Sequence, residues 1–202
     1  MSERPIRFGF TGGASSKRAK LLESARLVEQ LGYSTFGLAD HFVRPFAPLI
    51  AGMSVADATT TLRITQTVLA QDFREPAVLA KELATLDVLS EGRLQVGLGA
   101  GWLRQEYEDA SMRFGSAAVR IERLEETAVI LRGLFSAEPF SFHGEHYRIN
   151  DLTGAPVPDQ RPGPPIMIGG GGKKVLSVAA RQADIVQLMP SNRNGNTSLD
   201  PS

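Results

Sequence analysis

Short apolar runs alternate along the chain with longer segments in which apolar residues recur every three or four positions. The short runs are rich in β-branched and aromatic residues and predict six strands, at residues 6–10, 35–39, 63–69, 94–98, 166–168 and 185–188. The longer segments have the helical period and predict helices over 21–31, 76–89, 119–135 and 173–182. A pair of short runs turning at 143–145 breaks this rhythm and predicts a β-hairpin insertion near 139–151.

The order of these elements indicates an α/β protein with a parallel sheet, because successive strands begin about thirty residues apart with helices between the early ones. An open doubly wound sheet and a closed TIM-type (β/α)8 barrel share this order. Length alone favours the open sheet, whereas the residues at the strand ends favour a barrel that lacks its last two βα units. We expect one domain over residues 1–189. The polar stretch 190–202 is predicted to be disordered.

Composition narrows the range of partners. Lysine plus arginine and aspartate plus glutamate number 22 each, so no net field attracts nucleic acid or an anionic membrane. The absence of cysteine excludes disulfides, thiolate metal sites and a cysteine nucleophile. Residues 1–7 are polar, and no apolar run approaches the roughly 18 residues of a membrane span. We therefore expect a cytoplasmic protein whose partner is a small molecule, with no nucleic acid and no membrane.

The second predicted strand runs directly into Asp40 and His41. In either architecture, functional residues gather at the carboxyl ends of parallel strands. A histidine at this point can donate or accept a proton near neutral pH, and the neighbouring carboxylate can orient it. The alternative interpretation is a helix cap followed by a surface imidazole.

The fourth predicted strand ends in a glycine-rich sequence from Gly97 to Trp102. Alternating glycines would let a flat ligand approach the backbone closely. A dinucleotide fingerprint requires a third glycine, and Trp102 and Leu103 stand there instead, which disfavours that interpretation. Trp102 is either a packing aromatic or one wall of a ligand pocket.

Four consecutive glycines connect the fifth predicted strand to a helix. Their N–H groups gather at the helix N-terminus, where the macrodipole adds positive potential. Lys173 and Lys174 in the first turn oppose that dipole unless an anion compensates them. The sequence therefore predicts a phosphate site at Gly170, Gly171, Gly172 and Lys174, with a flexible turn as the alternative.

Other polar residues have simpler interpretations. His143 and His146 have no carboxylate or cysteine to complete a metal set, so we expect surface residues and no metal site. The charged cluster 120–126 is expected to be the solvated face of its helix. The sequence carries no Gly-x-Ser-x-Gly elbow, Walker loop or His-Glu-x-x-His motif.

Taken together, the strand ends resemble the luciferase-like monooxygenase superfamily, in particular its actinobacterial oxidoreductases that use the deazaflavin coenzyme F420. The similar stretches follow in family order and are Arg7–Phe10, Thr35–His41, Phe73–Asp87, Leu89–Trp102, Phe142–Tyr147 and Pro165–Gly170. The resemblance implies a (β/α)8 barrel with the coenzyme ring across the mouth formed by the strand ends. Family members usually continue into a seventh and an eighth strand, so the barrel expected here lacks them. It also implies that two copies can associate as a homodimer.

The resemblance further implies roles for individual residues. His41 would lie near the reactive carbon of the coenzyme as proton donor or acceptor, and Asp40 would contact the coenzyme. A non-prolyl cis peptide that props the ring from behind would fall at Val68–Leu69, and such a bond costs about 3–4 kcal/mol.

The remaining implied contacts come from the later strands. Ala100, Gly101 and Trp102 would line the coenzyme ring, and Lys174 with the glycine run would hold the phosphate of its side chain. Trp102 stands where some sugar-phosphate dehydrogenase relatives have an acidic residue, so their acid–base pair is not carried over to this chain.

These implications favour hydride transfer between coenzyme F420 and a small organic substrate, either reduction of a carbonyl or unsaturated acceptor or oxidation of an alcohol. The protein would contribute positioning and electrostatics, and the coenzyme would carry the hydride. One alternative keeps the fold and uses FMN, as a flavin-dependent monooxygenase. The other alternative is an inactive cofactor-binding remnant.

Overall fold

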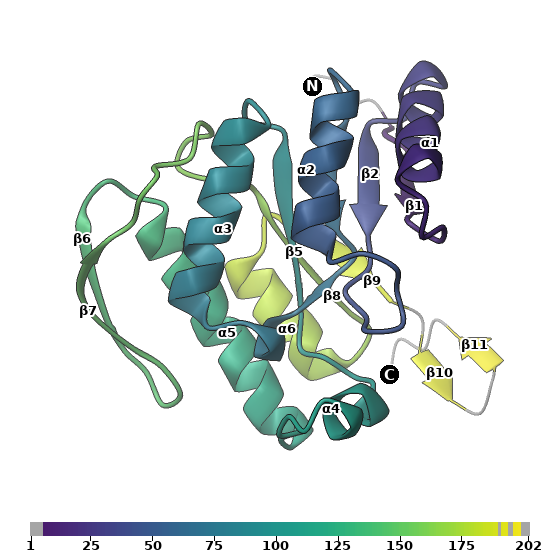
Figure 1. Ribbon diagram of the computed structural model, residues 1–202. Helices are drawn as coiled ribbons and strands as arrows, with labels where there is room; N and C mark the ends of the chain where they lie inside the picture. Colours follow the sequence, from purple (N-terminus) through teal and green to yellow (C-terminus); the bar gives the residue numbers. More distant parts are fainter. Residues whose placement is uncertain (1–5, 190, 194–195, 199–202) are drawn as a thin grey trace.

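The computed structural model describes residues 6–189, 191–193 and 196–198. Its centre is a curled sheet with the strand order β1-β2-β3-β5-β8-β9, in which every neighbouring pair is parallel (Figure 1). The strands are β1 (Gly9–Gly12), β2 (Thr35–Leu38), β3 (Arg63–Gln66), β5 (Leu94–Gly99), β8 (Ile166–Gly170) and β9 (Ile185–Leu188). The short strand β4 (Leu69–Ala70) follows β3 in the chain and also pairs with β5. All six predicted strands are present, but β1 begins three residues later than predicted and the predicted strand 63–69 is divided into β3 and β4.

The helices are α1 (Arg18–Gln30), α2 (Pro48–Ala58), α3 (Pro76–Leu89), α4 (Arg104–Asp109), α5 (Ala117–Leu134) and α6 (Lys173–Gln182), with a 3-10 turn η1 (Gln71–Phe73). The four predicted helices are present, and α3 begins with Pro76 in its first turn as expected. Helices α2 and α4 were not predicted. No helix of the described residues is long and apolar enough to cross a membrane.

Two hydrophobic clusters join one face of the sheet to the helices. One cluster packs β2 and β3 against α1 and α2, and the other packs β4, β5 and β8 against α3, α5 and α6. The strand residues in these clusters alternate along each strand, so the residues between them lie on the inner, concave face. The inner face is small or polar over much of its area, with Thr35, Gly37, Thr65, Gly97, Gly99 and Gly169.

The sheet is open within the described residues, because β1 and β9 each pair on one side only. Beyond β9, β10 (Ser191–Arg193) and β11 (Asn196–Ser198) form a separate antiparallel pair. Residues 190, 194–195 and 199–202 of the predicted disordered tail lie outside the described residues, so that prediction remains a prediction.

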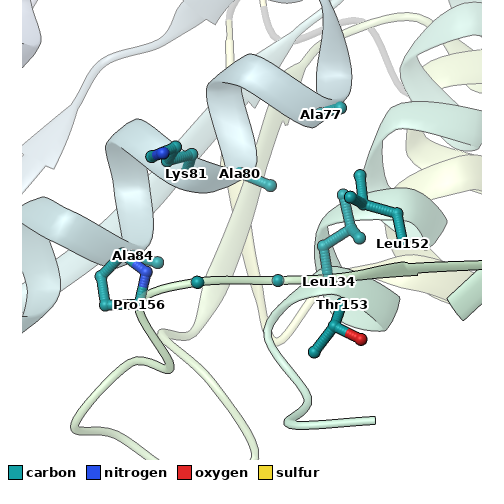
Figure 2. Close-up of a pocket in the computed structure, with 10 residues that line it drawn as sticks. Ala77, Ala80, Lys81, Ala84, Leu134, Leu152, Thr153 and Pro156 are labelled. Carbon is teal, nitrogen blue, oxygen red and sulfur yellow. The ribbon is translucent and has the colours of Figure 1, made fainter. Parts of the chain in front are cut away.

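The predicted hairpin insertion is confirmed as β6 (Pro139–His143) paired with β7 (Arg148–Thr153), with a register shift between Phe140 and Phe142. It lies apart from the main sheet, beside α3 and α5 (Figure 1). The chain leaving β7 borders a groove of about 160 Å³ that lies between it, α3 and the end of α5. Figure 2 shows this groove, which is lined by Ala77, Ala80, Lys81, Ala84, Leu134 and residues 152–156 and by none of the predicted site residues.

Candidate active site

A histidine–glutamate pair lies beyond the carboxyl end of β2. His41 Nδ1–H donates to Glu106 Oε2 at 2.8 Å, and the backbone N–H of Phe42 donates to Glu106 Oε1 at 2.9 Å. Glu106 is 6% exposed, whereas the His41 side chain is 25% exposed. A carboxylate can only accept, so this arrangement assigns the proton of a neutral imidazole to Nδ1 and leaves Nε2 as the acceptor.

The glutamate comes from α4, which Figure 1 places at the end of the sheet toward which β2 points. This helix has only six residues, with Glu106 and Tyr107 buried and Arg104, Gln105 and Glu108 exposed. Sequence reasoning missed Glu106, because it sought an acid at position 102 and found a tryptophan. The carboxylate that pairs with His41 stands four residues later. The available signal was a glutamate beside a tyrosine in a short segment between two loops, and that signal is weak.

Asp40 is buried and bonded to the protein on both oxygens. Its Oδ2 accepts from the backbone N–H of Ala70 at 3.2 Å and from Arg74 Nη1 at 2.7 Å, and its Oδ1 accepts from Arg74 Nη2 at 3.3 Å. Asp40 therefore ties the end of β2 to the two ends of η1. No bond joins it to His41, so Glu106 orients the imidazole and the sequence-based assignment of that task to Asp40 is wrong.

The predicted non-prolyl cis peptide is present one bond earlier than expected, at Thr67–Val68 rather than Val68–Leu69. Val68 lies on the inner face between two glycines, since a Cβ on Gly99 or Gly169 would lie 2.5 or 2.8 Å from one of its methyl groups. Leu69 is completely buried in the helix-side cluster. The structure thus places Val68 among the strand ends and keeps Leu69 away from them.

The glycines in β5 and in the loop after it are explained by packing within the chain. A Cβ on Gly97 would lie 1.8 Å from the carbonyl oxygen of Gln66. Gly101 has φ +70°, and a Cβ there would lie 1.9 Å from the Tyr107 hydroxyl. These glycines allow close contact between neighbouring parts of the protein, which differs from the flat-ligand interpretation of the sequence.

Trp102 is held beside His41 by the loop that follows β5. Arg120 Nε donates to the carbonyl oxygens of Ala100 and Gly101 at 3.2 and 3.3 Å and so fixes this loop. The indole is 70% exposed, and it meets the His41 ring edge to face with a centroid distance of 5.9 Å. Of its two interpretations, the wall of an open site fits better than a buried packing aromatic.

The charged cluster 120–126 is not the solvated face that the sequence predicted. Arg120 binds the loop after β5, Arg123 pairs with Asp72 at 3.1 Å, and Glu126 binds the hairpin. These residues are spaced by three, so they lie near one another along α5. Each of these three side chains binds buried or turn-forming groups of another segment.

The glycine run after β8 leads into α6 as predicted. Gly169 is buried against Val68, whereas Gly171 and Gly172 are exposed, and Gly172 is the N-cap with open space around its Cα. The first turn of α6 contains no acidic residue. Lys174 lines a groove between α5 and α6 together with Glu122 and Glu125. The backbone N–H groups, more than Lys174, therefore form the positive end of this helix.

The two histidines of the hairpin differ in their surroundings. His146 Nε2 lies 3.1 Å from Glu122 Oε2, and His143 is exposed. Among the described residues, no group of three or more histidine, aspartate or glutamate side chains could hold a metal ion.

The arrangement defines a class of protein: a parallel (β/α) barrel type with a histidine–carboxylate pair and an exposed aromatic at the carboxyl ends of its strands. The chain belongs to the luciferase-like monooxygenase family, whose model matches residues 5–196. The resemblance noted in the sequence is therefore confirmed.

Individual relatives include two kinds of enzyme. The chain is 31% identical over 190 residues to the F420-dependent glucose-6-phosphate dehydrogenase of Kineococcus radiotolerans, covering 90% of this chain and 56% of that protein. It is 36% identical over 127 residues to the FMNH2-dependent dimethylsulfone monooxygenase of Pseudomonas putida, covering 63% of this chain and 35% of that protein. The chain thus spans about half or less of the length of these relatives.

A solved structure confirms the predicted architecture. The coenzyme F420-dependent tetrahydromethanopterin reductase of Methanopyrus kandleri superposes with a TM-score of 0.83 at 19% identity, covering 94% of this chain and 57% of that one. The curled sheet therefore corresponds to the first six strands of a TIM-type barrel.

Proposed function

We propose that the protein is an oxidoreductase that transfers a hydride between coenzyme F420 and a small organic substrate. The observation that carries this proposal is the His41–Glu106 pair beside Trp102 at the strand ends. Oxidation of an alcohol removes a hydride from carbon and a proton from oxygen, and reduction of a carbonyl adds both. A site for this chemistry needs a proton acceptor or donor, and His41 Nε2 provides one.

His41 and Glu106 would divide the proton transfer between them. When an alcohol is oxidised, His41 Nε2 accepts the hydroxyl proton while Glu106 stabilises the positive charge that forms on the imidazole. When a carbonyl is reduced, the same nitrogen returns the proton. A positioned acid or base contributes about 10²- to 10⁴-fold to such a step. The deazaflavin of F420, when bound, supplies the two-electron hydride carrier.

The inner face of the barrel fits a coenzyme with polar groups and a phosphate. Thr67 Oγ1 and Gln187 Oε1 are buried in the described part of the chain without a hydrogen-bond partner, which leaves them free for a ligand. Val68 would support the ring, and Ala100, Gly101 and Trp102 would border it. The exposed N-terminus of α6, at Gly170, Gly171 and Gly172, would bind the phosphate, with Lys173 and Lys174 adding positive charge.

An FMN-dependent monooxygenase is the second candidate, favoured by the similarity to the dimethylsulfone monooxygenase. The F420 relatives match a larger share of this chain, 90% against 63%, which supports the first candidate. The histidine–carboxylate pair supports it as well, because it suits the proton transfer that accompanies alcohol or carbonyl chemistry.

Titration of the purified protein with F420 and with FMN, followed by fluorescence quenching, tests the choice of cofactor. We expect F420 to bind more tightly; tighter FMN binding would favour the monooxygenase, and binding of neither would favour the inactive remnant. The substitution Gly172→Asp tests the phosphate site for either cofactor, because a carboxylate at the N-cap suits the helix but repels a phosphate. Gly172→Ser is the matched control, since it caps the helix without charge.

A further inference from the structure

The hairpin contains the motif Phe142 to Tyr147, which has no role in the proposed chemistry. Its turn encloses the carboxylate of Glu126, which accepts the backbone N–H groups of residues 145–147 at 2.8–3.3 Å. Gly144 is required by this contact, because a Cβ there would lie 2.4 Å from Glu126 Oε2. The hairpin is therefore fixed to α5 at its tip.

From this fixed turn, Tyr147 extends into the protein and is only 9% exposed. Its hydroxyl accepts from Arg123 Nε at 2.9 Å and donates to Gln71 Oε1 at 3.2 Å. Gln71 Nε2 donates in turn to Asp72 Oδ1, and Asp72 Oδ1 lies 3.1 Å from Arg123 Nη1. Tyr147, Gln71, Asp72 and Arg123 thus form a closed ring of interactions, which we call the η1 ring.

Because the η1 ring lies in the interior of the protein, the loss of one of its hydrogen bonds is costly. Burial raises the pKa of the Tyr147 hydroxyl, although Arg123 opposes the shift. Burial likewise raises the pKa of Asp72 against the attraction of Arg123. Buried polar groups that lose a hydrogen-bond partner destabilise the protein, so the ring strongly favours one geometry of η1.

The turn η1 is linked through three connections to residues that adjoin His41 and Glu106 in the chain. The residues on either side of it, Ala70 and Arg74, hold Asp40, which precedes His41. The centroid of the Phe73 ring lies 4.9 Å from the centroid of the Phe42 ring and 5.1 Å from that of the Tyr107 ring. Phe42 follows His41 in the chain, and Tyr107 follows Glu106, so η1 is in contact with the neighbours of both members of the pair.

We propose that Tyr147 is a positioning residue for the His41–Glu106 pair, acting through the η1 ring. The hairpin insertion is then part of the site without contacting it. The catalytic importance of this role rests on the proposed function, whereas the geometric role can be measured without coenzyme or substrate.

The test is the substitution Tyr147→Phe, which removes only the hydroxyl. The chain has three histidines, so the imidazole N–H signals in a ¹H–¹⁵N spectrum are few, and His41→Ala assigns the signal of interest. We expect Tyr147→Phe to shift or broaden the His41 Nδ1–H signal by more than the control Tyr33→Phe does. Tyr33 packs against Phe8 and Phe10, away from η1.

An unchanged His41 signal in a folded Tyr147→Phe protein would overturn the proposal, even if urea denaturation showed a loss of stability. If Tyr147→Phe does not fold, Gly144→Ala decides, because it strains the same connection at the hairpin tip and must also move the His41 signal. With F420 and a turnover assay, Tyr147→Phe should lower kcat by up to about 100-fold at nearly constant KM. Failure of coenzyme binding alone would count against the proposed function and leave the NMR result valid.

Discussion

Replacement of Glu106 by glutamine tests the proton assignment at the candidate site. In the wild-type protein, each carboxylate oxygen accepts one N–H group, Oε1 from the Phe42 backbone and Oε2 from His41 Nδ1. Glutamine has one oxygen and one NH2 group. The Phe42 amide cannot give up its proton, so the glutamine oxygen must stay with it and the NH2 group must face His41. His41 then accepts at Nδ1 and carries its proton on Nε2.

The strength of this preference follows from the burial of Glu106, which is 6% exposed. The opposite orientation of the amide would leave the Phe42 N–H facing another donor, at a cost of about 1–3 kcal/mol, which corresponds to a preference of about 5- to 150-fold. With Nε2 protonated, His41 cannot accept a proton from an alcohol. We therefore expect Glu106→Gln to lower alcohol oxidation by about 5- to 150-fold, because the tautomer that can accept the proton is depopulated by that factor.

Two measurements check this expectation. The ¹⁵N chemical shifts of the His41 imidazole show which nitrogen carries the proton, and turnover with F420 shows the consequence for activity. Glu108→Gln is the matched control, because Glu108 lies on the same helix, is exposed and pairs only with Arg104 among the contacts described. If Glu106→Gln leaves the proton on Nδ1, or if turnover is undiminished, the reasoning is refuted.

Two further predictions concern stability. Gly101→Ala places a Cβ 1.9 Å from the Tyr107 hydroxyl at a φ of +70°, so urea denaturation should show a loss of at least about 2 kcal/mol in the free energy of unfolding. Gly172→Ala, which has open space around it, should cost about 1 kcal/mol or less, and equal losses for the two variants would contradict this account. Burial tends to raise the pKa of Glu29, but the N–H and hydroxyl groups of residues 60–62 donate to it and hold its pKa below the ordinary 4.5. The contribution of Glu29 to stability is therefore present above its ordinary pKa and is lost as the pH falls through its lowered pKa in the folded protein. The free energy of unfolding of the wild-type protein should then fall more steeply with acid than that of Glu29→Gln. Parallel curves for the two proteins would be inconsistent with this.

Sequence reasoning succeeded where local periodicity and packing agree. The strands are short runs of apolar and β-branched residues, the helices α1, α3, α5 and α6 carry apolar residues three or four positions apart, and Pro76 and the glycine run mark helix starts. Helix α2 begins with Pro48 in its first turn, the same start signal as Pro76 in α3, but it is apolar on nearly every side. It was missed because no helical period supports that signal.

Sequence reasoning predicted the residues of the candidate site that follow strands and missed the residue that a distant helix supplies. Asp40, His41 and Trp102 follow strands, and strand ends can be located from the chain alone. Glu106 is brought to His41 by a six-residue helix across a separation of 65 residues, and no local pattern carries that information. The charges of α5 were misread similarly, because a surface charge and a charge that binds a neighbouring segment look identical in the sequence.

The contact of Val68 with Gly99 and Gly169 has a consequence for how the family can vary. The methyl groups of one residue occupy the space that side chains at two other positions would need. A related protein with alanine at position 99 or 169 would need a smaller residue at position 68, and one with a larger residue at 68 would still need both glycines. These three positions should therefore covary as a unit across homologues, although they lie on three different segments of the chain.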